Sequence, residues 1–116
     1  MSINISISSE GKAKISMGSG KVRLDNLDKF LGRNRDAVLV KLEGDRDPSM
    51  VYKPGHICSI ETEDNQNYYA FVGSHLIGKL PQEAIAFAES VDSSPEFLVS
   101  MVGEVADDSI SIYIAE

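Results

Sequence analysis

The chain has 116 residues, 42% hydrophobic and 25% charged, which is typical of one globular domain and excludes an intrinsically disordered chain. No apolar run is long enough to span a bilayer, and the first residues alternate Ser or Asn with Ile, unlike a secretory signal. Cys58 is the one cysteine, so no internal disulfide can form, and we expect residues 1–116 to form a single cytoplasmic domain.

The net charge of −7 is unevenly distributed along the chain. Residues 1–55 hold ten Lys and Arg against seven Asp and Glu, whereas residues 56–116 hold one lysine against eleven acids. The acidic second half can serve solubility alone, but a basic strip on an acidic protein is a candidate surface for a phosphate or an acidic partner. The basic residues of interest are Lys21, Arg23, Arg33 and Arg35.

Residues 1–37 are predicted to form a strand pair and a short helix. Ile3, Ile5 and Ile7 alternate with polar residues, which is typical of a half-buried strand, and residues 12–17 can return as its partner. A short helix follows, which Asp25 can cap and which should stop at Gly32.

Residues 38–115 are predicted to form a barrel. Apolar alternation indicates strands at 37–43, 56–62, 68–72 and 76–78, and a closing hairpin at 97–105 and 109–115. Between them, Pro81 should start a helix over 82–91 that buries Ala84, Ile85, Ala88 and Val91. Seven or eight short strands with two short helices predict a mainly β (α+β) fold, a small OB-like or SH3-like barrel or sandwich.

Patterns of catalytic and metal-binding residues are weak in this sequence. His56 and His75 are not at a metal-ligand spacing, and the strand position of Cys58 favours a buried, unreactive thiol. An acidic loop could gather around a cation, although a solvated loop is the simpler interpretation; its residues are Glu43, Asp45 and Asp47. We therefore expect no enzymatic activity, no cofactor and no metal site.

Four short elements stand in the order found in a known family. They are the turn Pro54-Gly55, an acid–amide element at Glu63 and Asn65, the strand Ala70-Phe71-Val72, and the helix entry Gly78-Lys79-Leu80-Pro81. In these elements the chain resembles the HIRAN domain, over residues 38–115. Family members have OB-like folds and grip the 3′ end of single-stranded DNA. The resemblance implies DNA contacts at Tyr52, Asn65, Tyr68 and Tyr69, although the loop between Asn65 and Ala70 is shorter than in the family and lacks its aspartate.

Two functions remain open at the level of sequence. The first is a non-enzymatic nucleic-acid-binding module for single-stranded DNA or DNA ends, in which bases stack on Tyr68 and Tyr69 while the basic residues hold phosphates. The alternative is an acidic protein-interaction domain, a regulator or inhibitor of a basic partner. Convergence of the basic residues with the tyrosines would favour the first. The apolar strand Ile3–Ile7 could also pair with a second copy and form a homodimer.

Overall fold

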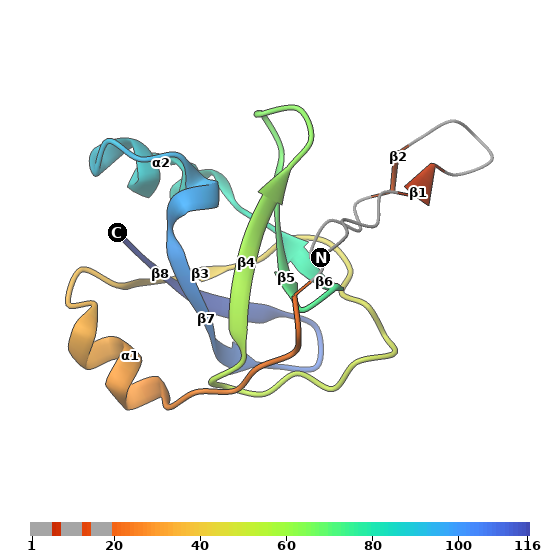
Figure 1. The fold of residues 1–116 in the computed structure, drawn as a ribbon, viewed down its shortest axis with the longest axis horizontal. Coiled ribbons are helices and arrows are strands. Elements are labelled where there is room, and N and C mark those ends of the chain that lie inside the picture. Colours follow the sequence, from red (N-terminus) through yellow and green to blue (C-terminus); the bar gives the residue numbers. More distant parts are fainter. Residues whose placement is uncertain (1–5, 8–12, 15–19) are drawn as a thin grey trace.

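The computed structural model describes residues 6–7, 13–14 and 20–116, and its centre is one antiparallel sheet of six strands (Figure 1). The strand order is β3-β8-β7-β4-β5-β6. The sheet curls into a half-barrel accompanied by two short helices, which confirms the predicted mainly β, barrel-like α+β class. The strands are β3 (Val38–Lys41), β4 (Ile57–Thr62), β5 (Tyr68–Val72), β6 (His75–Lys79), β7 (Val99–Val105) and β8 (Ile110–Ala115).

The two edges of the curled sheet meet at a single bridge. The N–H of Glu43 donates to the carbonyl oxygen of Lys79 at 2.9 Å, and the N–H of Lys79 donates to that of Glu43 at 2.7 Å. Glu43 lies just beyond β3 and Lys79 ends β6, so these bonds join the first and last strands of the sheet.

Alternate residues of β8 point into the barrel interior. In β8, Ile110, Ile112 and Ile114 are buried, whereas Ser111 and Tyr113 remain partly exposed. Full burial of an isoleucine side chain stabilises the fold by about 1.5–3 kcal/mol. The period-two pattern that predicted this strand is therefore the pattern that places its side chains in the core.

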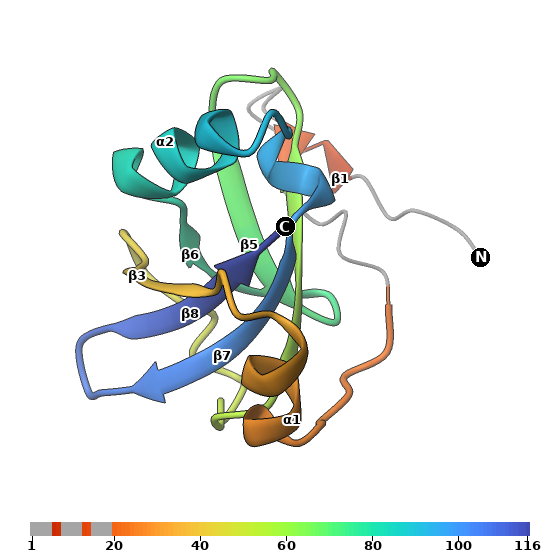
Figure 2. The same cartoon turned by 90° about the vertical axis from the view of Figure 1, so that its left-hand side faces the viewer.

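The helices α1 (Leu27–Arg33) and α2 (Gln82–Ser90) lie at opposite ends of the barrel (Figure 2). As predicted, α2 begins after Pro81 and buries Ala84 and Ala88, which share one face of a helix. Ile85 is only partly buried against the core, in contrast to the prediction, because a residue adjacent to Ala84 points about 100° away from it around the helix.

The cap of α1 differs from the prediction by one residue. The Oδ1 of Asn26 accepts a hydrogen bond from the N–H of Lys29 at 3.0 Å, which makes Asn26 the N-cap. Asp25 instead accepts from the N–H of Asn26 at 2.7 Å, outside the helix. The helix also continues one residue beyond Gly32, where it was expected to stop.

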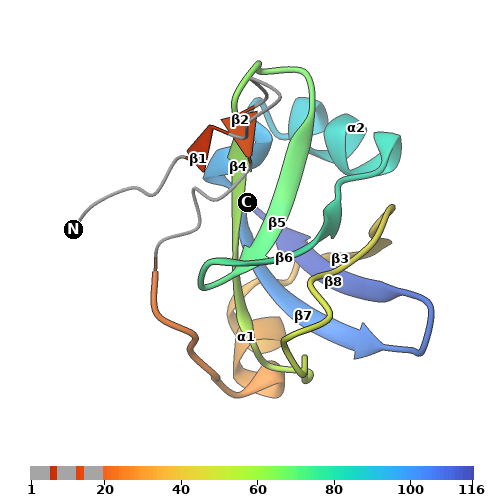
Figure 3. The same ribbon diagram turned by 90° about the vertical axis from the view of Figure 1, so that its right-hand side faces the viewer.

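The segment before α1 runs along the start of β4 (Figure 3). The N–H of Ile57 donates to the carbonyl oxygen of Arg23, and the N–H of Asp25 to that of Gly55, both at 2.9 Å. Residues 20–37 therefore pack onto the barrel of residues 38–115.

Further towards the N-terminus, β1 (Ser6–Ile7) pairs with β2 (Ala13–Lys14) of the same chain. Ile3 and Ile5 lie outside the described residues, and the predicted homodimer stays a prediction. Among the described residues, no helix is long and apolar enough to cross a membrane.

Candidate functional site

A groove opens where β4 separates from β7. Only two residue pairs join these strands, Ile57 with Met101 and Cys58 with Ser100. Beyond Cys58, β4 pairs with β5 alone, while the chain that leads into β7 turns aside as the 3-10 helix η1 (Pro95–Phe97). The resulting groove has a volume of about 650 Å³ and is lined from both strands, from η1 and from α1.

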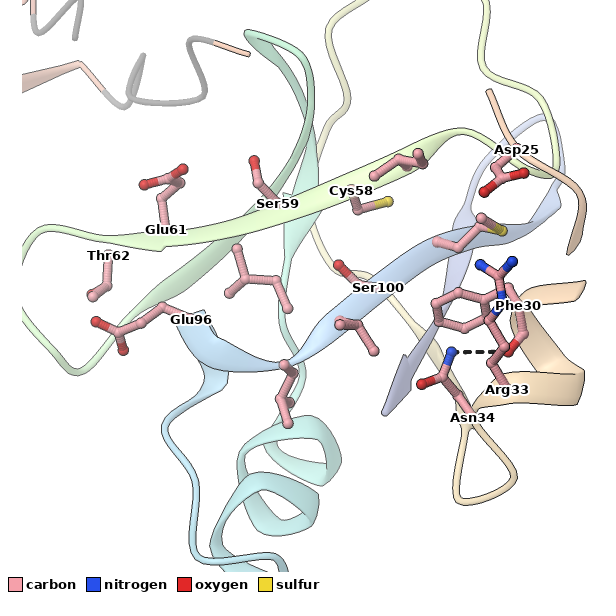
Figure 4. A pocket seen from close by; sticks show the side chains of 15 residues that line it. Asp25, Phe30, Arg33, Asn34, Cys58, Ser59, Glu61, Thr62, Glu96 and Ser100 are labelled. Carbon is pink, nitrogen blue, oxygen red and sulfur yellow. Dashed lines mark hydrogen bonds between the residues drawn. The ribbon is translucent and has the colours of Figure 1, made fainter. Parts of the chain in front are cut away.

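Charge is distributed unevenly along the groove (Figure 4). Glu61 and Glu96 lie at one end, and Arg33 lies at the other with Asp25. Apolar side chains from α1 and the strands form much of the wall between them. The groove can therefore hold an elongated ligand with an apolar body, and its Glu61–Glu96 end is suited to a cation. The apolar lining residues are Phe30, Ile57, Ile60, Leu98, Val99 and Met101.

Ser100 contributes a buried hydroxyl group to the wall of this groove. Its side chain is only 4% exposed, and its Oγ has no hydrogen-bond partner among the described residues. A buried polar group left unpaired costs about 1–3 kcal/mol. Figure 4 shows the hydroxyl of Ser100 between β4 and β7, where a ligand group could bond to it.

At the acidic end of the groove, two carboxylates repel each other. Burial raises the pKa of Glu61, and the nearby charge of Glu96 raises it further, against an opposing hydrogen bond from Ser59. Glu96 accepts a hydrogen bond from the hydroxyl of Ser94, which holds its carboxylate beside the groove. A cation bound here would relieve the repulsion between the two carboxylates.

Two exposed apolar residues follow Glu96 of the acidic end closely in the chain. Phe97 of η1 is 76% exposed, and Val99, two residues further on, is 44% exposed. Phe97 stands between Glu96 and Leu98, which both line the groove. A large aromatic side chain this exposed next to a concave site is typical of an interaction surface.

Three of the four predicted basic residues flank the same part of β4. Arg33 lines the groove on one side, and Lys21 and Arg23 line a smaller cavity of about 70 Å³ on the other. The two cavities share the stretch Ile57–Ser59. Arg35 is exposed after α1 and lines neither cavity.

The tyrosines do not form the expected stacking surface. Tyr52 and Tyr68 are 6% and 7% exposed and belong to the core cluster. The Tyr52 hydroxyl donates to the carbonyl oxygen of Leu76 at 2.7 Å. Because successive strand residues face opposite sides of a sheet, Tyr69 points outward and is partly exposed, opposite Glu61. Only Tyr69 of the three rings is available for stacking on a base.

Asn65 has a structural role in the loop between β4 and β5. Its φ of 58° is left-handed, a conformation that asparagine tolerates well. Asp64, which the sequence analysis did not single out, organises this loop: its Oδ1 accepts from the N–H groups of Gln66 and Asn67 at 2.9 and 2.8 Å. Aspartate bonding to the backbone of following residues is a recognised turn signal and could have identified it.

The loop between β3 and β4 contains a second cluster that the sequence did not reveal. Asp47 lies 3.0 Å from Nδ1 of His75, and its other oxygen accepts from both the N–H and the hydroxyl of Ser49. These bonds, led by that of the Ser49 hydroxyl, lower the pKa of Asp47 to about 2. In the described part of the chain, no group of three or more His, Cys, Asp or Glu side chains is arranged to hold a metal ion.

Cys58 carries a partly buried thiol that packs against the core. Its Sγ donates to the carbonyl oxygen of His56 at 3.7 Å, and burial raises its pKa. Both effects favour the protonated, less nucleophilic form of the sulfur, and the expected lack of reactivity stays a prediction.

Comparison of the chain with models of protein families, with curated proteins and with solved structures finds no match.

Proposed function

We propose that this protein is an interaction module that binds a basic segment of another protein in the groove between β4 and β7. The observation that carries the proposal is the 76% exposed Phe97, placed beside a groove whose near end holds Glu61 and Glu96.

Apolar contact supplies the affinity in this proposal. An aromatic side chain can bury about 150–250 Å² in an interface, and such residues are frequent among those that dominate binding energy. Phe97 and Val99 already expose their side chains, so a partner could cover them without rearrangement of the core.

Charge supplies the selectivity. Residues 56–116 contain eleven acids and one lysine, and both Glu61 and Glu96 belong to this half. The resulting negative potential attracts basic partners and disfavours acidic ones.

Selection of random phage-displayed peptides on the full chain tests the proposal. We expect enriched peptides to combine Lys or Arg with apolar residues, and to bind Phe97→Ser at least roughly tenfold more weakly. Val51→Ser is the matched control, because Val51 is 75% exposed but does not line the groove. Absence of enrichment, or equal loss in both variants, would overturn the proposal.

A nucleic-acid-binding module is the second candidate, favoured by Lys21, Arg23 and Arg33 around Ile57–Ser59. On this hypothesis phosphates contact the basic residues and one base stacks on the outward-facing Tyr69. The acids Asp25, Glu61 and Glu96 in the same groove argue against a polyanion, which is why this candidate stands second.

Fluorescence anisotropy with a labelled single-stranded deoxyoligonucleotide, at low and high salt, tests the second candidate. If it holds, removing Lys21 and Arg23 together should reduce the salt dependence of binding, and Tyr69→Ala should weaken binding by about ten- to a hundredfold. Lys41→Ala on β3 serves as the control. Failure to bind at low salt would eliminate nucleic acid as the ligand.

A further inference from the structure

The acidic end of the groove contains two carboxylates that no cationic side chain of the described residues balances. In the described part of the chain, neither Glu61 nor Glu96 forms an ion pair with a Lys, Arg or His side chain. Both carboxylates are partly buried, so water screens their repulsion less than it would on an open surface. The fold therefore keeps two mutually repelling carboxylates close together, and no ion pair within the described residues offsets that repulsion.

Ser100 is an independent sign of a ligand in the same groove. Its Oγ is buried and unpaired among the described residues, and it lies between the acidic end and the Arg33 end (Figure 4). A hydroxyl oxygen accepts hydrogen bonds, as carboxylates do, so the groove offers acceptors at two positions along its length: at its acidic end and at Ser100.

We infer that the groove binds one arginine side chain of the partner, with its guanidinium at Glu61 and Glu96 and a donor group of the same residue at Ser100. This inference rests on the proposed protein-binding function and specifies what is recognised. A guanidinium has five N–H donors in a plane and is weakly hydrated, which suits several acceptors in a partly buried site better than a compact ammonium does. The apolar wall formed by Leu98 and Val99 would pack against the aliphatic stem.

Titration with N-acetyl-arginine-N-methylamide, followed by two-dimensional amide NMR on the full chain, tests this inference. Its matched control is the citrulline analogue, which has nearly the same shape and no charge. We expect saturable shifts for Glu61, Thr62 and residues 96–100, with a dissociation constant on the order of millimolar. The citrulline analogue should bind at least roughly tenfold more weakly, because its hydrogen bonds lose the assistance of charge.

Three variants connect the binding to the groove. Glu61→Gln and Glu96→Gln should each weaken the arginine probe by roughly tenfold, whereas Glu104→Gln, on an exposed part of β7 outside the groove, should not. Ser100→Ala should weaken the probe by roughly two- to tenfold without lowering the melting temperature, because the hydroxyl has no partner to lose within the described chain. A purely structural serine would lower the melting temperature instead.

Equal shifts with arginine and citrulline, shifts elsewhere on the surface, or no effect of the glutamate variants would overturn the inference. A lysine probe that binds as tightly as arginine would also overturn the choice of arginine. The inference can fail while the proposed function stands: peptides that are selected through Phe97 while the arginine probe does not bind would leave the docking surface intact and remove only this subsite.

Discussion

Glu61 lines the groove, and its ionised form destabilises the folded protein. Burial first, and then the charge of Glu96, raise its pKa above that of the unfolded chain. A folded state that binds the proton more tightly loses stability as the pH rises through that range. Functional surfaces are where such costs are commonly found.

Replacing Glu61 by Gln should therefore stabilise the protein at pH 7. The gain should be a few °C at most, because the side chain is partly exposed, and it should vanish near pH 3, where the carboxyl is already protonated. Thermal unfolding at the two pH values measures this, with Glu104→Gln as control. A lower melting temperature at pH 7 would contradict the assigned repulsion.

The pKa values of Asp47 and Asp64 are shifted in the opposite direction to that of Glu61. Hydrogen bonds from the Ser49 hydroxyl and His75 lower the pKa of Asp47 to about 2, and those from the N–H groups of Asn67 and Gln66 lower the pKa of Asp64. A depressed pKa contributes stability that is complete above the unfolded value of about 3.9 and is lost as the pH falls towards the folded value.

The melting temperature should consequently fall between about pH 4 and pH 2. Asp47→Asn and Asp64→Asn should each make this fall shallower, because the group that titrates has been removed. Asp108→Asn, in the exposed turn between β7 and β8, should retain the slope of the original protein. Unchanged slopes in the first two variants would show that their hydrogen bonds do not persist in solution.

Among the elements, α2 is a short helix in which packing against the core determines which face is buried. Ala88 is 0% exposed against the core, whereas Ala86 on the same helix is exposed. Ala88→Leu should lower the free energy of unfolding by about 1–3 kcal/mol, because a well-packed core has no room for the added methylenes. Ala86→Leu should change it by less than about 0.5 kcal/mol in the same urea titration. Similar effects at both sites would mean that the buried face is wrongly assigned.

The segment before α1 depends on one glycine at the start of β4. Gly55 has a φ of 98°, and an added Cβ would lie 2.5 Å from the carbonyl oxygen of Asp25. Gly55→Ala should therefore cost about 1–3 kcal/mol in strain and force the segment away from β4.

At Gly32, inside α1, an added Cβ is expected to stabilise the protein rather than to strain it. Apart from its chain neighbours and the backbone of its own helix, no atom of residues 20–116 or of the described strands β1 and β2 lies within 4 Å of its added Cβ, so Gly32→Ala should stabilise the protein by about 0.5–1 kcal/mol through helix propensity. Denaturation midpoints of the two variants should move in opposite directions. A neutral Gly55→Ala would show that the contact between Asp25 and Gly55 is dispensable.

For the molecule as a whole, the net charge of −7 predicts self-repulsion at neutral pH. Added sodium chloride screens this repulsion, so the melting temperature at pH 7 should rise between about 10 and 150 mM salt, as the screening length falls from about 30 to 8 Å. At the isoelectric point, near pH 4.7, the same addition should have little effect. A rise of equal size at both pH values would point to a general salt effect.

Elements whose signal is local could be predicted from the amino-acid sequence alone. The alternation in β8, the strand Tyr68–Val72 and the helix after Pro81 all appear where expected, because period and chain-breaking residues act over a few residues. Errors of one residue occurred at the ends of α1, where Asp25 and Asn26 are both good caps and only the backbone geometry chooses between them.

The candidate site, in contrast, depends on pairing between strands that are far apart in the chain. The groove exists because the pairing of β4 with β7 stops after Cys58 and Ser100, which are 42 positions apart in the chain. The same long-range pairing buries the Ser100 hydroxyl, which has no hydrogen-bond partner in the described part of the chain, and the turn of η1 exposes Phe97. Strand alternation puts Tyr68 and Tyr69 on opposite sides of β5, but which of the two enters the core depends on how the sheet curls. Contacts of this range leave no local pattern, so single-sequence reasoning could not locate them.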